Sequence, residues 1–289
     1  MKNEYSNSGR IKKVCAVILT ALLLISAMPV IPGAGRVSAA NPVFVRIYLN
    51  GAWKMDLTDS ISTLNSYINK NKDKNIRLEM LTDWNAAAVG RQSDFDKSLV
   101  IPSGARVTLD MHGHVFNRDN AWKDHYTTDG DVIQVESNAT LTINGSSTDE
   151  EKNTLHKDVP VYTSTHKGYT AVERKNFTGG LIMGGVNSAW GGGLTIKSGC
   201  TVTLNDVTIA GCCSRDTSYT DNGYGGAIRL RDDDCRLTLN NCLITGNMSD
   251  DQGGGICVCD DDKFIIELNN TIIEKNFASK KGGGIYLGG

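Results

Sequence analysis

Proline and surplus positive charge are both scarce in this chain of 289 residues. Five prolines against 31 glycines suit a protein with many tight turns between short strands. The formal net charge is −2. Residues 1–40 hold five of the 30 Lys and Arg residues and one of the 32 Asp and Glu residues, which leaves 25 basic and 31 acidic side chains beyond them. This balance argues against a protein that binds nucleic acid or an anionic membrane surface through bulk charge.

Long apolar runs are absent after the first tenth of the chain. The one such run, Val14–Ile31, follows a basic region at residues 10–13 and precedes small residues at 37–40. This order is typical of a secretory signal peptide. A single membrane anchor is the alternative, and the two prolines and the small-residue site that end the run argue against it. We therefore expect residues 1–40 to be a signal peptide, the mature chain to be secreted or at the cell surface, and no membrane span in it.

Repetition dominates the last third of the chain. Each of four units opens on consecutive glycines and an aliphatic residue, and the aliphatic positions are Leu194, Ile228, Ile256 and Ile285. The spacing is 34, 28 and then 29 residues. Each complete unit holds three short stretches of alternating apolar residues bounded by Gly, Asn or Asp, which is typical of strands. Leucine-rich repeats and propeller blades do not fit the motif or the length. The pattern predicts an all-β parallel β-helix with three short strands per coil.

Alignment of the units places asparagines in two columns at the turns. The predicted columns contain Asn144, Asn205, Asn240, Asn269, and separately Asn247 and Asn276. Asp110 joins the first column, and Cys212 takes the equivalent place in the second. Stacked Asn side chains can hydrogen-bond from one coil to the next and satisfy the backbone of the turn.

The N-terminal part of the mature chain has a different pattern. Residues 43–49 and 75–81 alternate as strands, and between them Ile61, Leu64 and Ile68 form one apolar face of a helix that Thr58 or Asp59 can cap. We expect residues 41–98 to form a small α/β cap over the first coil. Residues 99–289 are then the β-helix, with the loops Asp119–Gly130 and Ser146–Lys175 as excursions. Because no second cap is visible, we expect this β-helix to be C-terminally incomplete.

Two segments resemble known families. Residues 99–114 (LVIPSGARVTLDMHGH) resemble the opening coil of large secreted bacterial β-helix proteins. Residues 247–256 (NMSDDQGGGI) and 276–285 (NFASKKGGGI) resemble repeats of the polymorphic outer-membrane proteins and related adhesins. These proteins belong to the pectin-lyase-like superfamily, so the resemblance implies right-handed coils. The superfamily includes lyases, hydrolases and adhesins, so the resemblance implies no single activity.

Two acidic turns form a candidate metal site. The runs of three carboxylates are 28 residues apart and stack on adjacent coils, as Asp232, Asp233 and Asp234 and as Asp260, Asp261 and Asp262. Ca²⁺ prefers oxygen ligands and would relieve the repulsion among six carboxylates. The alternative is two solvated turns, because no EF-hand loop is present. His112 and His114 can also face one side of a strand and bind a metal, or can simply be exposed on a turn.

Aromatic, basic and cysteine residues supply the remaining candidates. Exposed Trp122 and Trp190 in loops, with Arg229 and Arg231, can contact a sugar, although a Trp can equally pin its loop to the β-helix. Cys200 and Cys235 align and could bridge. Seven cysteines beyond the signal segment leave at least one thiol without an intramolecular partner. Cys257 and Cys259 are expected to point outward, without the C-x-x-C spacing of a zinc site.

No concentrated catalytic set is visible in this sequence. The preferred hypothesis is a non-catalytic, adhesin-like surface protein that binds an extracellular glycan or a host or cell-surface protein. The alternative is a carbohydrate-active enzyme, a polysaccharide lyase or a glycoside hydrolase, because the acidic turns lie near Arg229 and Arg231. A groove that holds these residues together would favour the enzyme, and scattered exposure would favour the adhesin.

Overall fold

The computed structural model describes residues 43–58, 60–85, 97–118, 130–166, 169–188, 190–215, 223–258 and 263–288. Several sequence-based predictions fall outside these ranges: the signal peptide, Trp122, Cys259 and the second acidic turn, Asp260–Asp262. Residues 41–289 form one compact unit. Among the described residues, no helix is long and apolar enough to cross a membrane.

The N-terminal segment forms a small α/β layer. It contains β1 (Val45–Leu49), β2 (Ala52–Leu57), α2 (Ile61–Lys70), β3 (Asn75–Met80) and β4 (Trp84–Asn85). The helix begins after Ser60, which is its N-cap. Ser60 has an extended backbone, and its hydroxyl accepts a hydrogen bond from the Thr63 N–H. The prediction of Thr58 or Asp59 as the cap was therefore wrong by one or two residues. The apolar face is buried as expected, because Ile61, Leu64 and Ile68 pack into the core.

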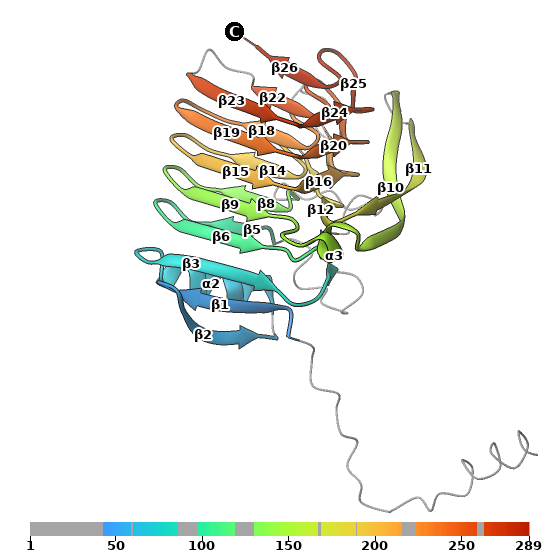
Figure 1. Ribbon diagram of the computed structural model, residues 1–289. Helices are drawn as coiled ribbons and strands as arrows, with labels where there is room; N and C mark the ends of the chain where they lie inside the picture. Colours follow the sequence, from blue (N-terminus) through green and yellow to red (C-terminus); the bar gives the residue numbers. More distant parts are fainter. Residues whose placement is uncertain are drawn as a thin grey trace, which may run out of the picture. The chain divides into compact units, whose positions relative to one another are not determined.

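The rest of the chain passes repeatedly through four parallel sheets (Figure 1). The first sheet continues from β3 through β6 (Arg106–Asp110), β9 (Thr140–Asn144), β15 (Thr201–Asn205), β19 (Cys235–Asn240) and β23 (Phe264–Asn269). The second contains β4, β7 (Val115–Asn117), β12 (Gly180–Met183), β16 (Val207–Ala210), β20 (Leu243–Thr245) and β24 (Ile272–Glu274). The third contains β13 (Val186–Asn187), β17 (Cys213–Ser214), β21 (Met248–Ser249) and β25 (Phe277–Ala278). The fourth contains β5 (Leu99–Ile101), β8 (Ile133–Val135), β14 (Leu194–Ile196), β18 (Ile228–Leu230), β22 (Ile256–Val258) and β26 (Ile285–Leu287).

Equivalent strands of successive repeats pair in register. Val202 pairs with Leu237, and Leu237 with Ile266, so inward-facing aliphatic side chains stack into one continuous core. Burial of such a side chain stabilises the fold by about 1.5–3 kcal/mol. The prediction of a mostly β chain with parallel sheets is confirmed. The complete repeats also contain a two-residue strand in the third sheet, one more than the three strands predicted.

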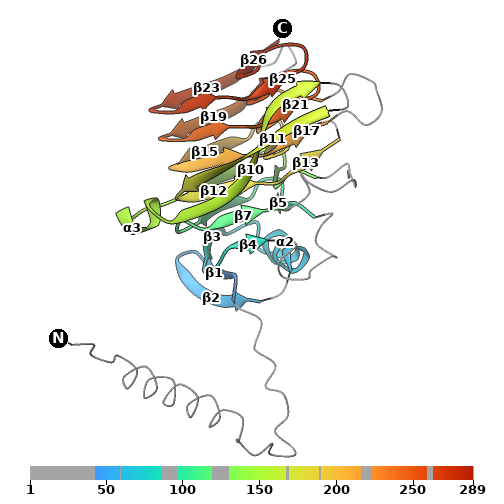
Figure 2. The same cartoon turned by 90° about the vertical axis from the view of Figure 1, so that its right-hand side faces the viewer.

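The excursion at residues 146–175 is folded onto the stack. It forms the short helix α3 (Asp149–Lys152) and the antiparallel hairpin of β10 (Leu155–His166) and β11 (Tyr169–Thr178). Val159 and Val161 of β10 pack on Leu181, Met183 and Ala210 of the second sheet. The Tyr162 N–H donates to the Gly246 carbonyl at 2.9 Å. Figure 2 shows the hairpin lying across the strands of the stack.

Candidate functional site

The turn after the first sheet carries a chain of side-chain hydrogen bonds. Each asparagine amide donates to the residue one repeat earlier: Asn144 to Asp110, Asn205 to Asn144, Asn240 to Asn205 and Asn269 to Asn240, at 2.7–2.9 Å. In the second column, the Asn247 amide donates to the Asn276 side chain at 3.0 Å and the Asn247 oxygen accepts from the Cys212 N–H at 3.0 Å. These asparagines therefore hold successive repeats together.

The backbone conformation of the turn explains why aspartate is suited to part of the first acidic run, Asp232–Asp234. Asp234 has a φ of 59° and lies where the preceding repeats have Gly104, Asn138 and Gly199, all with positive φ. Asp tolerates this left-handed conformation better than most residues. Asp232 also has a positive φ, and its carboxylate lies 3.5 Å from Arg231. All three carboxylates are exposed. The other half of the expected calcium site lies outside the described residues.

Arginine and aromatic side chains form a cluster on the outer side of the fourth sheet. The Arg229 guanidinium carbon lies 5.0 Å from the ring centre of Trp190 and 4.6 Å from that of Tyr224. Arg231 lies 4.3 Å from the Trp190 ring centre. Such contacts are cation–π interactions, worth about 0.5–2 kcal/mol each. The structure thus brings together three of the four residues predicted to contact a ligand.

Burial divides this cluster into two parts. Arg229 is 2% exposed, so it supports the loop above it and is not accessible to a large ligand. Trp190, Tyr224 and Arg231 are partly exposed. Tyr224 was missed in the sequence, although it precedes Gly225 as Trp190 precedes Gly191. An aromatic residue before the glycines of two successive units was the available signal.

The cysteines are mostly buried thiols. Cys200 and Cys235 are both free, so the bridge considered between them is not present; each thiol donates to a backbone carbonyl instead. Burial raises the pKa of Cys212 to about 12 and those of Cys235 and Cys242 to about 11. Cys257 points outward as predicted, since it pairs with Arg229 and lies outside the core that holds Ile256 and Val258. It is nevertheless fully buried, and it is disulfide-bonded.

The two histidines do not share a site. His114 Nδ1 lies 3.0 Å from Asp83, and this hydrogen bond lowers the pKa of the Asp83 carboxyl. His112 Nδ1 lies 2.9 Å from Glu151 Oε1. Burial raises the pKa of Glu151, but hydrogen bonds from His112, Ser147 and Thr148 outweigh it and hold that pKa at about 2. The structure therefore does not bring the two rings to one metal site, because each ring is hydrogen-bonded to a different carboxylate.

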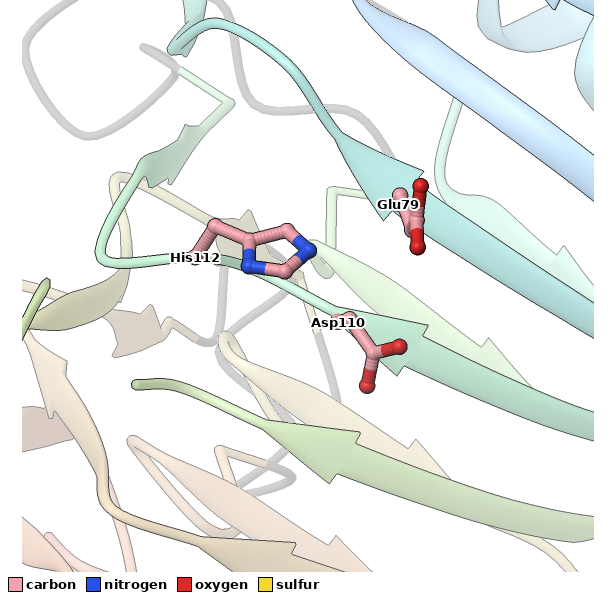
Figure 3. A group of neighbouring side chains, drawn as sticks. All are labelled: Glu79, Asp110 and His112. Atoms are coloured by element: carbon pink, nitrogen blue, oxygen red, sulfur yellow. The ribbon is translucent and has the colours of Figure 1, made fainter. Parts of the chain in front are cut away.

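A second group of potential ligands surrounds His112. Glu79 of β3 and Asp110 of β6 pair directly across the first sheet, and His112 follows Asp110 in the turn (Figure 3). One ligand atom from each of the three residues lies within 4.8 Å of the other two. Sequence reasoning did not find Glu79, since it lies in the N-terminal segment and outside the repeated motif.

Two open pockets flank the hairpin. The larger, about 610 Å³, is lined by Asp83, His156, Lys157, Asp158 and Arg174 together with apolar residues of β7, β10 and β12. The smaller, about 310 Å³, lies between β11 and the strands β20 and β24, where Glu173 and Glu274 pair with Lys175 and Lys275. Neither contains Trp190, Arg229, Arg231 or the acidic turn.

Comparison with known families gives one local match. Residues 270–288 match the Chlamydia polymorphic membrane protein repeat. This segment contains β24, β25 and β26, the last described strands of three sheets. Comparisons with curated proteins and with solved structures yield no match.

Proposed function

We propose that residues 99–289 form a right-handed parallel β-helix of the pectin-lyase-like type and that residues 41–98 are its N-terminal cap. Parallel pairing of equivalent strands supports the coiled path. The right hand follows from the resemblance of the repeats and from the strong preference of parallel crossover connections for that hand.

We further propose that the chain is displayed outside the cell as a non-catalytic, adhesin-like module. The observation that carries this proposal is the match of residues 270–288 to the polymorphic membrane protein repeat. The matched segment is in register with the repeats before it, since β24 and β26 pair with β20 and β22. The segment at residues 1–40 supplies the export signal in this proposal, and the partner is an extracellular glycan or a host or cell-surface protein.

The partly exposed members of the aromatic cluster are the proposed contact surface. Trp190 and Tyr224 offer ring area, and Arg231 offers a guanidinium for a carboxylate or hydroxyl on the partner. Buried Arg229 holds both rings in place from below, so the surface is preorganised and loses little side-chain entropy on binding. A rigid display surface of this kind fits recognition without chemistry.

The test measures binding and turnover with the same purified protein. Immobilised acidic and neutral glycans and whole host cells serve as partners, and Arg231→Ala is compared with Arg236→Ala. Arg236 is the matched control, because it is similarly exposed but pairs with Glu267 on the first sheet. We expect Arg231→Ala alone to weaken binding at least tenfold.

An assay of product formation distinguishes the adhesin proposal from the enzyme alternative. Unsaturated products and new reducing ends are read on a polysaccharide panel with added Ca²⁺ and with chelator. Binding without product supports the adhesin. Calcium-dependent unsaturated product would establish a lyase, and new reducing ends a hydrolase; either would overturn the adhesin proposal.

A further inference from the structure

We propose that Glu79, Asp110 and His112 form a binding site for one divalent transition-metal ion such as Zn²⁺. The three residues come from two adjacent strands and the turn that follows the second, and their side chains gather at the C-terminal ends of these strands (Figure 3). The proposal concerns a different site from the contact surface above and does not depend on it.

Charge is the first reason. Glu79 and Asp110 lie directly opposite each other, where like charges are destabilising. The later repeats have asparagine at this position, and Asn144 needs only an acceptor at residue 110, which an asparagine would also supply. The hydrogen-bond chain therefore does not explain why residues 79 and 110 are both acidic. A cation beside them does.

Arg77 is the cation that now occupies this place. Its two terminal nitrogens lie 2.5 Å from Glu79 and 3.2 Å from Asp110. The Tyr48 hydroxyl also donates to Glu79, at 2.9 Å. One arginine faces the two carboxylates of Glu79 and Asp110, so these three side chains together retain one negative charge. The Arg77 side chain is 43% exposed, so it can swing aside when an ion binds.

The orientation of His112 is the second and independent reason. Glu151, from α3, accepts from His112 Nδ1 through Oε1, while its Oε2 accepts from the backbone N–H groups of Ser147 and Thr148 at 2.6 and 3.0 Å. Glu151 is thus fixed by the capping box of α3. A carboxylate on one ring nitrogen typically orients the other nitrogen of a metal-binding histidine. Here it leaves Nε2 as the ligand.

The donor set defines the class of metal. One imidazole nitrogen and two carboxylate oxygens suit zinc and its first-row neighbours, and water would fill the remaining positions. Calcium prefers six to eight oxygen ligands and would gain nothing from the imidazole. The proposed site therefore differs in chemistry from the calcium site considered at the acidic turns.

Calorimetric titration with ZnCl₂ of the purified protein tests the site. His112→Asn is the informative variant, since asparagine also tolerates the φ of 51° at this position. His114→Asn is the matched control, because His114 pairs with Asp83 and lies outside the group. We expect one Zn²⁺ per chain, at least tenfold weaker binding for His112→Asn, and no change for His114→Asn.

Arg77→Gln separates this site from adventitious zinc binding. It removes the competing guanidinium, so we expect it to tighten Zn²⁺ binding severalfold, which a loss of structure would not do. Glu151→Gln should weaken binding about tenfold through loss of the oriented imidazole. Circular dichroism checks that each variant is folded. Absence of zinc binding to the wild type, or equal affinity of the two histidine variants, would overturn the proposal.

Discussion

Asn144 donates its side-chain amide to the carboxylate of Asp110 at 2.7 Å, across the neighbouring strands β6 and β9. Every later bond in this column has the same direction, because each amide donates to the preceding repeat. Hydrogen bonds aligned in this way polarise one another. The column begins at the carboxylate of Asp110, although an asparagine oxygen would also serve as the acceptor at this position.

Replacement of an internal member of the column tests its contribution. Asn205→Ala removes the bond to Asn144 and the bond from Asn240, so we expect the free energy of unfolding to fall by about 1–3 kcal/mol. Thr203→Ala, on the same face of β15, is the control and should cost less than about 1 kcal/mol. Urea unfolding followed by circular dichroism measures both. Equal losses would show that the ladder adds nothing beyond strand packing.

The contact between Gly246 and the hairpin gives a second prediction. A Cβ on Gly246 would lie 2.5 Å from the Cβ of Val161, and the φ of Gly246 is 62°. We expect Gly246→Ala to destabilise the protein by more than about 2 kcal/mol. Gly104→Ala, with a φ of 74° and nothing within 4 Å, should cost only the backbone strain of about 1–2 kcal/mol.

A double mutant then isolates the contact with the hairpin. Val161→Gly removes the atom that clashes, so the loss for the pair Val161→Gly and Gly246→Ala should be at least about 1 kcal/mol smaller than the sum of the single losses. Denaturant unfolding of the four proteins completes the cycle. Strict additivity would mean that β10 does not rest on Gly246 in solution.

Periodicity made the parallel sheets predictable, and its absence explains what was missed. The spacing of Leu194, Ile228 and Ile256 matches residues that pair in the structure, because one residue per repeat must fill each place in the stack. The third-sheet strands are only two residues long, too short for alternation to be visible. The hairpin at residues 155–178 occurs once, so no repeat could reveal it.

Contacts at the candidate sites were harder to predict than the sheets. Glu151 lies 39 residues after His112 in the sequence and belongs to the helix of an excursion that has no counterpart in the repeats. Arg229 was expected at the surface because the sequence gives the face of a strand but not the loop that covers that face. Trp190 and Tyr224 close over it from loops that each precede a glycine run.

The aromatic cluster gives a third prediction. Trp190→Ala removes the ring that contacts both arginines and opens the cover over buried Arg229. We expect a loss of about 2–4 kcal/mol in the free energy of unfolding. Trp190→Phe keeps a ring in place and should lose less than half as much. If both variants unfold at the wild-type urea concentration, the ring does not hold the loop and belongs to the contact surface alone.

Buried thiols predict how the protein responds to alkali. The pKa of Cys212 is about 12 in the folded state against an ordinary value of 9.0, and burial is the cause. As the pH rises above about 9, the unfolded chain loses this proton first, so the stability contributed by the neutral thiol falls by up to about 1.4 kcal/mol per pH unit until the folded pKa is reached. Below pH 9 this thiol should leave stability independent of pH.

Alkylation measures directly how well the fold shields the buried thiols. At pH 8 we expect iodoacetamide to leave Cys212 and Cys213 unmodified in the native protein, since both are at most 1% exposed, and to modify both in urea. Cys212→Ser is the partner variant for the alkaline unfolding series. Because a serine does not titrate there, its stability should fall less steeply between pH 9 and 11 than that of the wild type. Rapid native alkylation of Cys212 at pH 8 would mean that the repeats open locally far more often than their packing implies.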